Sequence, residues 1–184
     1  MLQGLPVRIL SPAQVGLTLP DVQETGSSPL ENARLKALAY HAAWCRPVFS
    51  CDSGLFFDDV AASEQPGTRV RTVGDRRLSD EEMLAHYMAL AARHGGLLRA
   101  QYHNAICLID ESGCLHETCE EALRSTVFGL SAAPHPRRDP GFPLDALSVH
   151  LATGKYYYDL GDAVRFNETC SHGLGFRRFF QALE

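Results

Sequence analysis

The stretch "PVFSCDSGLFFDDV", residues 47–60, decides the fold because it predicts a buried strand that leads into a candidate binding site. Its first five residues form a short apolar run after a helix-like segment, which is typical of a buried β-strand. Asp52 and Gly54 follow where this strand is expected to end. A turn would explain both residues. A ligand site would also explain them, because a carboxylate at the carboxyl end of a buried strand faces the crevice where open α/β sheets bind ligands, and glycine permits close approach.

Two helices are predicted around this strand. Ser28 suits an N-cap, and Glu31, three residues later, completes a capping box for a helix over residues 29–44. A second helix is predicted over residues 80–94, with Ser79 as its N-cap and Glu82 as the partner in a capping box, and it stops at the glycine pair that follows it. Each start signal is local, so each helix is predicted independently of the rest of the chain.

The remaining segments predict short strands and one more helix. The predicted strands cover residues 7–10, 97–110 and 114–123, together with a hairpin over residues 146–160 that turns at Thr153-Gly154. The segment between residues 61 and 77 is expected to be a long loop, and the chain is expected to close with a helix from about Ser171 to Leu183. This order of elements predicts a mixed α/β protein.

Composition narrows the class of protein. The 184 residues suffice for one domain or two small lobes with a sizeable core, and the formal net charge of −5 does not favour nucleic acid as a partner. No apolar run reaches the roughly 18 residues of a membrane span, and the N-terminus lacks the pattern of a signal peptide. Six cysteines without a C-x-x-C pair indicate reduced thiols and a cytoplasmic location.

Acidic side chains near the predicted strand are candidates for a magnesium site. Carboxylates on two elements, such as Glu31 and Asp52, can share a Mg²⁺ ion that bridges phosphate oxygens. Lys36, on the same helix as Glu31, could then act as a point charge on a phosphate. Ordinary structural roles remain open: Glu31 as a helix cap, Asp52 as a turn residue, Lys36 as a solvated side chain, and the pair Asp58-Asp59 as surface.

Other candidate ligands have weaker patterns. Histidines and cysteines alternate along two predicted strands, but they lack the spacing of a tetrahedral zinc site. These residues are His103, Cys107, Cys114, His116 and Cys119. Ser171 and His172 stand at the start of the last predicted helix, where a cap and an exposed imidazole are the ordinary interpretation.

Six blocks, in this order, resemble the signature of the inosine triphosphate pyrophosphatase family. Three of them, E-T-G, E-N-A-x-x-K-A and D-S-G-L, lie within "ETGSSPLENARLKALAYHAAWCRPVFSCDSGLFFDDV", residues 24–60. The others are "QPGTRVR" at residues 65–71, "GFPLD" at residues 141–145 and "FNETCSH" at residues 166–172. Each block alone is a weak signal, but six in register from about residue 20 to the end make the resemblance specific.

The resemblance implies a fold and a reaction. The family's fold is an elongated, two-lobed α/β structure with a mixed sheet flanked by helices and an active site in the cleft between the lobes. This implies a single pyrophosphatase-like domain over residues 1–184 that forms a homodimer. With Mg²⁺ as cofactor, such proteins hydrolyse ITP, dITP or XTP to the monophosphate and pyrophosphate. The alternative is a related protein that binds a nucleotide without hydrolysing it.

The resemblance also implies a role for particular residues. Glu31 and Asp52 would bind the metal, and Asp52 would also activate water. The phosphates would contact Lys36, Ser53 and Gly54. The base would be bound by Phe142, which stacks on the purine, and by Asp145, Ser171 and His172, which recognise its edge.

Several positions depart from the family pattern. The family opens with a strand and a T/S-x-N-x-x-K phosphate loop, and this chain is expected to be truncated relative to it because its first residues match a later segment. At four other positions this chain differs from the family pattern. It has Cys51 in place of an acid, Leu144 in place of an aromatic residue, Phe166 in place of a lysine and Gly173 in place of an arginine. A thiol is a poor ligand for Mg²⁺, and the lost cations would face the nucleotide, so these changes favour the non-hydrolysing alternative.

Overall fold

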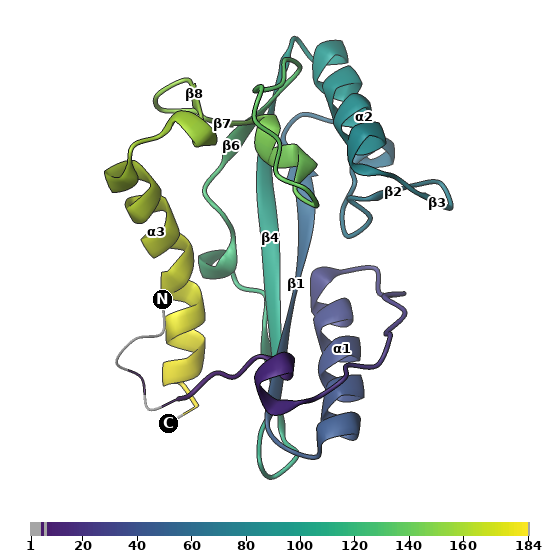
Figure 1. Cartoon of the computed structure of the whole chain (residues 1–184), viewed down its shortest axis with the longest axis vertical. Helices are drawn as coiled ribbons and strands as arrows, with labels where there is room; N and C mark the ends of the chain where they lie inside the picture. Colours follow the sequence, from purple (N-terminus) through teal and green to yellow (C-terminus); the bar gives the residue numbers. More distant parts are fainter. Residues whose placement is uncertain (1–4, 6, 184) are drawn as a thin grey trace. The chain divides into compact units, whose positions relative to one another are not determined.

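The computed structural model describes residue 5 and residues 7–183, and for residues 163–172 it describes the backbone alone. Its helices are α1 (Pro29–Trp44), α2 (Asp80–Arg93) and α3 (Asp162–Gln181). Its strands are β1 (Val48–Phe57), β2 (Thr72–Val73), β3 (Arg76–Arg77), β4 (Leu97–Ile109), β5 (Leu115–Thr118), β6 (Phe128–Ser131), β7 (Ser148–His150) and β8 (Lys155–Tyr156). The predicted class, α/β with a multi-stranded sheet flanked by helices, is confirmed (Figure 1).

Within the described residues, six strands form one sheet in the order β1-β4-β6-β7-β8, with β5 also paired to β4. The pairs of β4 with β5 and β6, of β6 with β7 and of β7 with β8 are all antiparallel. None of the helices described in full is long and apolar enough to cross a membrane.

The chain divides into two compact units. Unit 1 comprises Met1–Ser53, His103–Arg124 and Cys170–Glu184, and unit 2 comprises Gly54–Tyr102 and Ser125–Thr169. The division falls within β1, β4 and α3, so each of these elements contributes residues to both units.

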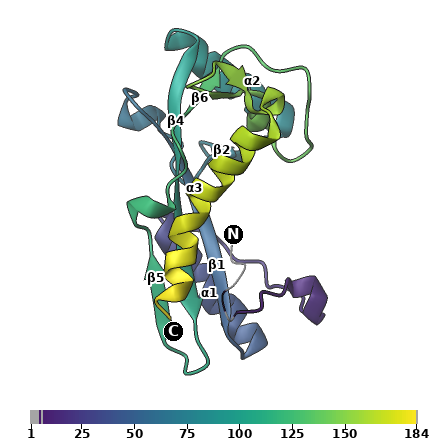
Figure 2. The same cartoon turned by 90° about the vertical axis from the view of Figure 1, so that its left-hand side faces the viewer.

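Unit 1 is built on the second half of β4. Because side chains alternate along a strand, Ala105 and Cys107 pack against Ala33 and Ala37 of α1, whereas Ile106 packs on the opposite face. The partners of Ile106 there are Leu123 and Phe180, the latter from α3. Figures 1 and 2 show α1 and the C-terminal part of α3 on opposite sides of these strands.

Unit 2 has its own core beneath α2. The buried residues of this helix are Met83, Leu84, Tyr87, Leu90 and Ala91, which recur at helical spacing. They belong to one cluster with apolar side chains of β1, β4 and β6 and of the 3₁₀ turn Pro143–Ala146. This core holds the "GFPLD" segment against α2, because Leu144 is buried within it.

Several predicted boundaries are wrong. Residues 7–10 form no strand; they are exposed, and Ser11 caps a 3₁₀ turn over Pro12–Val15. A four-residue apolar run becomes a strand only where a neighbouring backbone accepts its hydrogen bonds. The last helix begins at Asp162, just after Gly161, and not at Ser171, so Ser171 lies inside α3 and cannot be its cap. The segment predicted as a long loop contains the short β2–β3 pair.

The most informative correction concerns β1, which does not end at Asp52. The strand continues through Asp52 and Gly54 to Phe57. Leu55 donates to the Gly67 carbonyl at 2.9 Å and accepts from the Gly67 amide at 3.0 Å. A Cβ atom on Gly54 would lie 3.1 Å from the Gly67 carbonyl oxygen. Gly54 therefore permits this close pairing of the strand, which is a different role from that of a turn.

Candidate functional site

The site is built at the start of α1. Ser28 is the N-cap, and its hydroxyl accepts from the Glu31 amide at 3.2 Å, as the sequence predicts. The predicted capping box is wrong, because the Glu31 carboxylate binds one residue further upstream. It accepts from the Ser27 amide at 2.6 Å and from the Ser27 hydroxyl at 2.8 Å. Both hydrogen bonds lower the pKa of Glu31 and keep its carboxylate ionised, and the bond from the Ser27 hydroxyl has the larger effect.

Asn32 joins the loop before α1 to strand β1. Its side chain is 1% exposed, so both ends of the amide require partners. The Oδ1 atom accepts from the Gly26 amide at 2.8 Å, and the Nδ2 atom donates to Asp52 Oδ2 at 3.3 Å. A Cβ atom on Gly26 would lie 2.6 Å from Asn32 Oδ1, which explains why glycine stands here.

Lys36 completes an ionic group around Asp52. Its Nζ atom lies 2.7 Å from Asp52 Oδ1 and 3.1 Å from Glu24 Oε1. The side chains of Lys36 and Asp52 are only 13% and 10% exposed. Burial disfavours the charged ammonium, but hydrogen bonds to Asp52 and Glu24 outweigh it, so the pKa of Lys36 is raised. We call Glu24, Asn32, Lys36 and Asp52 the Lys36 cluster.

Strand geometry decides which side chains accompany Asp52. Successive side chains of β1 point to opposite faces, so Cys51 and Ser53 do not share the face of Asp52. The Ser53 hydroxyl donates to Asn104 Oδ1 at 2.7 Å. Gly54 is buried beside Gly67, as described above. The phosphate-binding roles of Ser53 and Gly54 stay predictions.

Two of the four predicted base-binding residues, Phe142 and Asp145, lie in one segment of unit 2. Phe142 is 66% exposed and precedes the 3₁₀ turn Pro143–Ala146, in which the Asp145 amide donates to the Phe142 carbonyl at 3.2 Å. Leu144, which replaces the family's aromatic residue, is buried and anchors this segment. The predicted partners Ser171 and His172 lie in α3, outside the residues whose side chains are described.

A magnesium ion fits part of this arrangement. Carboxylate oxygens are its preferred ligands, and Mg²⁺ is commonly held by one or two carboxylates together with substrate phosphates. Among the residues with described side chains, no three His, Cys, Asp or Glu are grouped to hold an ion by themselves. The donor chemistry of Asp52, Glu24 and Glu31 therefore suits an ion that a triphosphate helps to bind, rather than a closed protein site.

Two of the weaker zinc candidates, Cys107 and His116, have structural roles. Cys107 is buried in the core of unit 1. His116 Nε2 lies 2.7 Å from Asp110 Oδ2 at the hairpin between β4 and β5. Asp58, in unit 2, pairs with Arg99 at the surface, and Asp59 adopts a positive φ of 56° beside it.

Sequence reasoning missed Glu24 and Asn32 as members of the site. Two signals could have identified them. Asn32 and Lys36 are four residues apart, which places both on one face of α1. Glu24 and Gly26 belong to the E-T-G block, which the structure ties to Lys36 and Asn32 respectively.

The Lys36 ion pair predicts a pH dependence of stability. A lysine whose pKa is raised on folding contributes stability below its unfolded pKa, and this contribution is lost as the pH rises through the folded pKa. We therefore expect the difference in melting temperature between the wild type and Lys36→Gln to shrink above about pH 10.5. Thermal melts between pH 7 and 11.5 measure this. The matched control is Lys155→Gln, at the exposed second lysine, and an equal pH trend in both variants would contradict the prediction.

Comparison with known proteins supports the resemblance. The model of the Ham1 family matches residues 1–163. A dITP/XTP pyrophosphatase of Anaeromyxobacter sp. (strain Fw109-5) is 35% identical over 82 residues, which are 45% of this chain and 33% of that protein. The aligned part thus spans about a third of the length of this curated relative.

Solved structures share the fold. A HAM1 protein from Coxiella burnetii has a TM-score of 0.69 at 19% identity, covering 99% of this chain and 88% of that one. The Staphylococcus aureus Ham1 protein has a TM-score of 0.66 at 20% identity, and the match covers 89% of this chain and 82% of that one. Together with the match of the family model, these findings confirm the resemblance: the chain belongs to the Ham1 family.

Proposed function

We propose that this protein hydrolyses the non-canonical purine nucleotides ITP, dITP and XTP to the monophosphate and pyrophosphate, with Mg²⁺ as cofactor. The observation that carries the proposal is the ion pair between Lys36 of α1 and Asp52 of β1, whose side chains are about nine-tenths buried. Removing two charges from water is costly, so such pairs are concentrated where function requires them. The name of the Anaeromyxobacter relative supports the same reaction class.

In the proposed reaction, Asp52 acts on the attacking water. The water oxygen forms a bond to the α-phosphorus, the bond from that phosphorus to the bridging oxygen breaks, and pyrophosphate leaves. Asp52 accepts the proton of the water, while Asn32 fixes the carboxylate through its bond to Oδ2. Lys36 binds phosphate oxygens. Asp52 and Glu31 would hold Mg²⁺, which would supply charge neutralisation at the phosphates.

We assign stacking on the base to Phe142. The exposed ring of Phe142 is available to stack on a purine, and Asp145 lies three residues further along the chain. A 6-keto purine lacks the amino donor of adenine, so fixed polar groups can select for it. We keep Ser171 and His172 as proposed partners of the base edge.

A nucleotide-binding relative without hydrolysis is the second candidate. The observation in its favour is that Lys36 Nζ already contacts Asp52 Oδ1 at 2.7 Å, so a metal ion would have to compete for that oxygen. Cys51, which replaces an acid of the family pattern, adds to this case.

One assay separates the two candidates. Pyrophosphate release from ITP, XTP, GTP and ATP is measured with and without Mg²⁺, alongside calorimetric binding of ITP. We expect Mg²⁺-dependent turnover that favours ITP or XTP. Binding without turnover would support the non-hydrolysing relative, and the absence of both would contradict both candidates.

Three further expectations from the sequence remain proposals. We propose that residues 1–184 act as a single pyrophosphatase-like domain, that the protein forms a homodimer, and that it is cytoplasmic.

A further inference from the structure

Two charged side chains of unit 2 hold the backbone of Gly141, the residue before Phe142. The Gly141 amide donates to Asp80 Oδ2 at 2.7 Å, and the Gly141 carbonyl accepts from Arg71 Nη2 at 2.9 Å. Arg71 and Asp80 also pair with each other, with Nη1 2.5 Å from Oδ1. We call this closed triangle of three contacts the Gly141 clamp.

The clamp is stronger than an ordinary loop contact. Bonds to ionised groups are roughly twice as strong as neutral ones, and here both backbone groups of one residue are bound in this way. The Gly141 amide and then Arg71 lower the pKa of Asp80, so its carboxylate stays ionised near neutral pH. Gly141 has a φ of 84°, a conformation that other residues rarely adopt.

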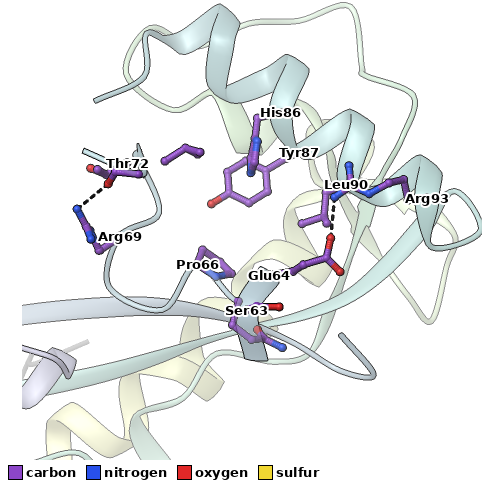
Figure 3. A pocket seen from close by; sticks show the side chains of 12 residues that line it. Ser63, Glu64, Pro66, Arg69, Thr72, His86, Tyr87, Leu90 and Arg93 are labelled. Carbon is purple, nitrogen blue, oxygen red and sulfur yellow. Dashed lines mark hydrogen bonds and ion pairs between the residues drawn. The ribbon is translucent and has the colours of Figure 1, made fainter. Parts of the chain in front are cut away.

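Both arms of the clamp are anchored to α2. Asp80 is the first residue of this helix, directly after its N-cap Ser79. Arg71 follows Val70, whose carbonyl accepts from the Tyr87 hydroxyl of α2 at 2.8 Å. Figure 3 shows Tyr87 reaching across from α2 toward the 63–74 segment, at a pocket of about 360 Å³ that these two elements enclose.

The clamp fixes one end of the segment that carries Phe142. At the other end, Leu144 is buried in the core of unit 2. Between these points the Phe142 amide donates to the Asp139 carbonyl at 3.0 Å. Phe142 itself remains 66% exposed, so its backbone is held on both sides while the residue stays accessible.

We infer that Asp80 and Arg71 are positioning residues that hold Phe142 ready to stack on the purine of the substrate. The inference rests on the proposed function. Ordering an aromatic side chain before binding reduces the entropy lost on binding, so the clamp increases affinity for the base. The base does not take part in bond breaking, so the effect falls on KM rather than on kcat.

The test uses Asp80→Ala and Arg71→Ala in the full chain. We expect each variant to raise KM for ITP by roughly tenfold while kcat changes less than twofold. Inorganic tripolyphosphate, which has no base, should inhibit the wild type and both variants with the same Ki. The Gly141 amide should exchange with solvent faster in both variants, as measured by NMR. The control is Arg76→Ala, which removes an exposed ion pair between Arg76 and Glu82. Glu82 lies in the first turn of α2, as Asp80 does, and the control should change none of these values.

The outcomes separate this inference from the proposed function. An unchanged KM in the presence of faster Gly141 exchange would overturn the positioning role. A parallel rise in the tripolyphosphate Ki would also overturn it, because general damage would then explain the effect. If the wild type neither binds nor hydrolyses ITP, the proposed function is contradicted, and the proposed stacking of Phe142 on a purine is contradicted with it. The exchange rate at Gly141 still decides whether the clamp holds the segment.

Discussion

Replacing Asp52 by asparagine is expected to lower kcat for ITP hydrolysis by about 10²–10⁴-fold while the protein remains folded. The asparagine side chain has the shape of the aspartate side chain, and its amide oxygen can still accept a hydrogen bond from Lys36 or Asn32, the two partners of Asp52. It cannot accept a proton from water, and it is a weaker ligand for Mg²⁺. Pyrophosphate release measures the loss of activity, and circular dichroism with a thermal melt measures the fold.

Asp58→Asn is the matched control for this substitution. Asp58 lies six residues further along the same stretch, but its side chain is 54% exposed and pairs with Arg99 at the surface of unit 2. We expect its kcat to equal that of the wild type. Full activity in Asp52→Asn would remove Asp52 from the reaction. An equal loss in both variants would show that the assay reports general damage to the protein.

The sequence predicted α1 and α2 well because their start signals are local. Ser28 and Ser79 both cap their helices as expected, and α2 has the full capping box with Glu82. In α1 the box failed because the Ser27 amide and hydroxyl were available to the Glu31 carboxylate. A spacing rule identifies a possible partner but does not show which neighbouring donor is closer.

The errors in strand prediction have a non-local cause. The end of β1 depended on Gly67, thirteen residues beyond Gly54 in the chain, whose backbone extends the pairing of the strand. The run at residues 7–10 had the composition of a strand but forms none. Strand formation is decided by a partner that composition does not reveal.

The contacts around the candidate site could not be predicted from the sequence, and the roles of its residues stay predictions. The motif blocks singled out Lys36 and Asp52, and the structure places their side chains 2.7 Å apart. Periodicity could not show that Glu24, before the helix, would reach Lys36, because the loop between them has no regular geometry. The Gly141 clamp was likewise hidden, since its members are 9, 61 and 70 residues apart.

Gly175→Ala is expected to destabilise the protein by about 3 kcal/mol, near the upper end of typical costs for overpacking. A Cβ atom on Gly175 in α3 would lie 2.1 Å from the Ala122 carbonyl oxygen and 2.9 Å from the Leu123 amide nitrogen. These are backbone atoms, so no rotamer change relieves the contact. Leu123 is also fully buried against Phe180, so moving this turn disturbs the core of unit 1. A loss of 3 kcal/mol corresponds to a fall in melting temperature of about 6–12 °C.

Intrinsic helix propensity predicts the opposite sign. Alanine is favoured over glycine inside a helix by about 1 kcal/mol, so a helix in contact with solvent would gain stability from this substitution. The matched control is Gly161→Ala, just before α3, where an added Cβ atom would meet no atom within 4 Å. We expect its melting temperature to stay within about 2 °C of the wild type. If Gly175→Ala melts at or above the wild-type temperature, α3 does not pack against the Ala122–Leu123 backbone as closely as the structure shows.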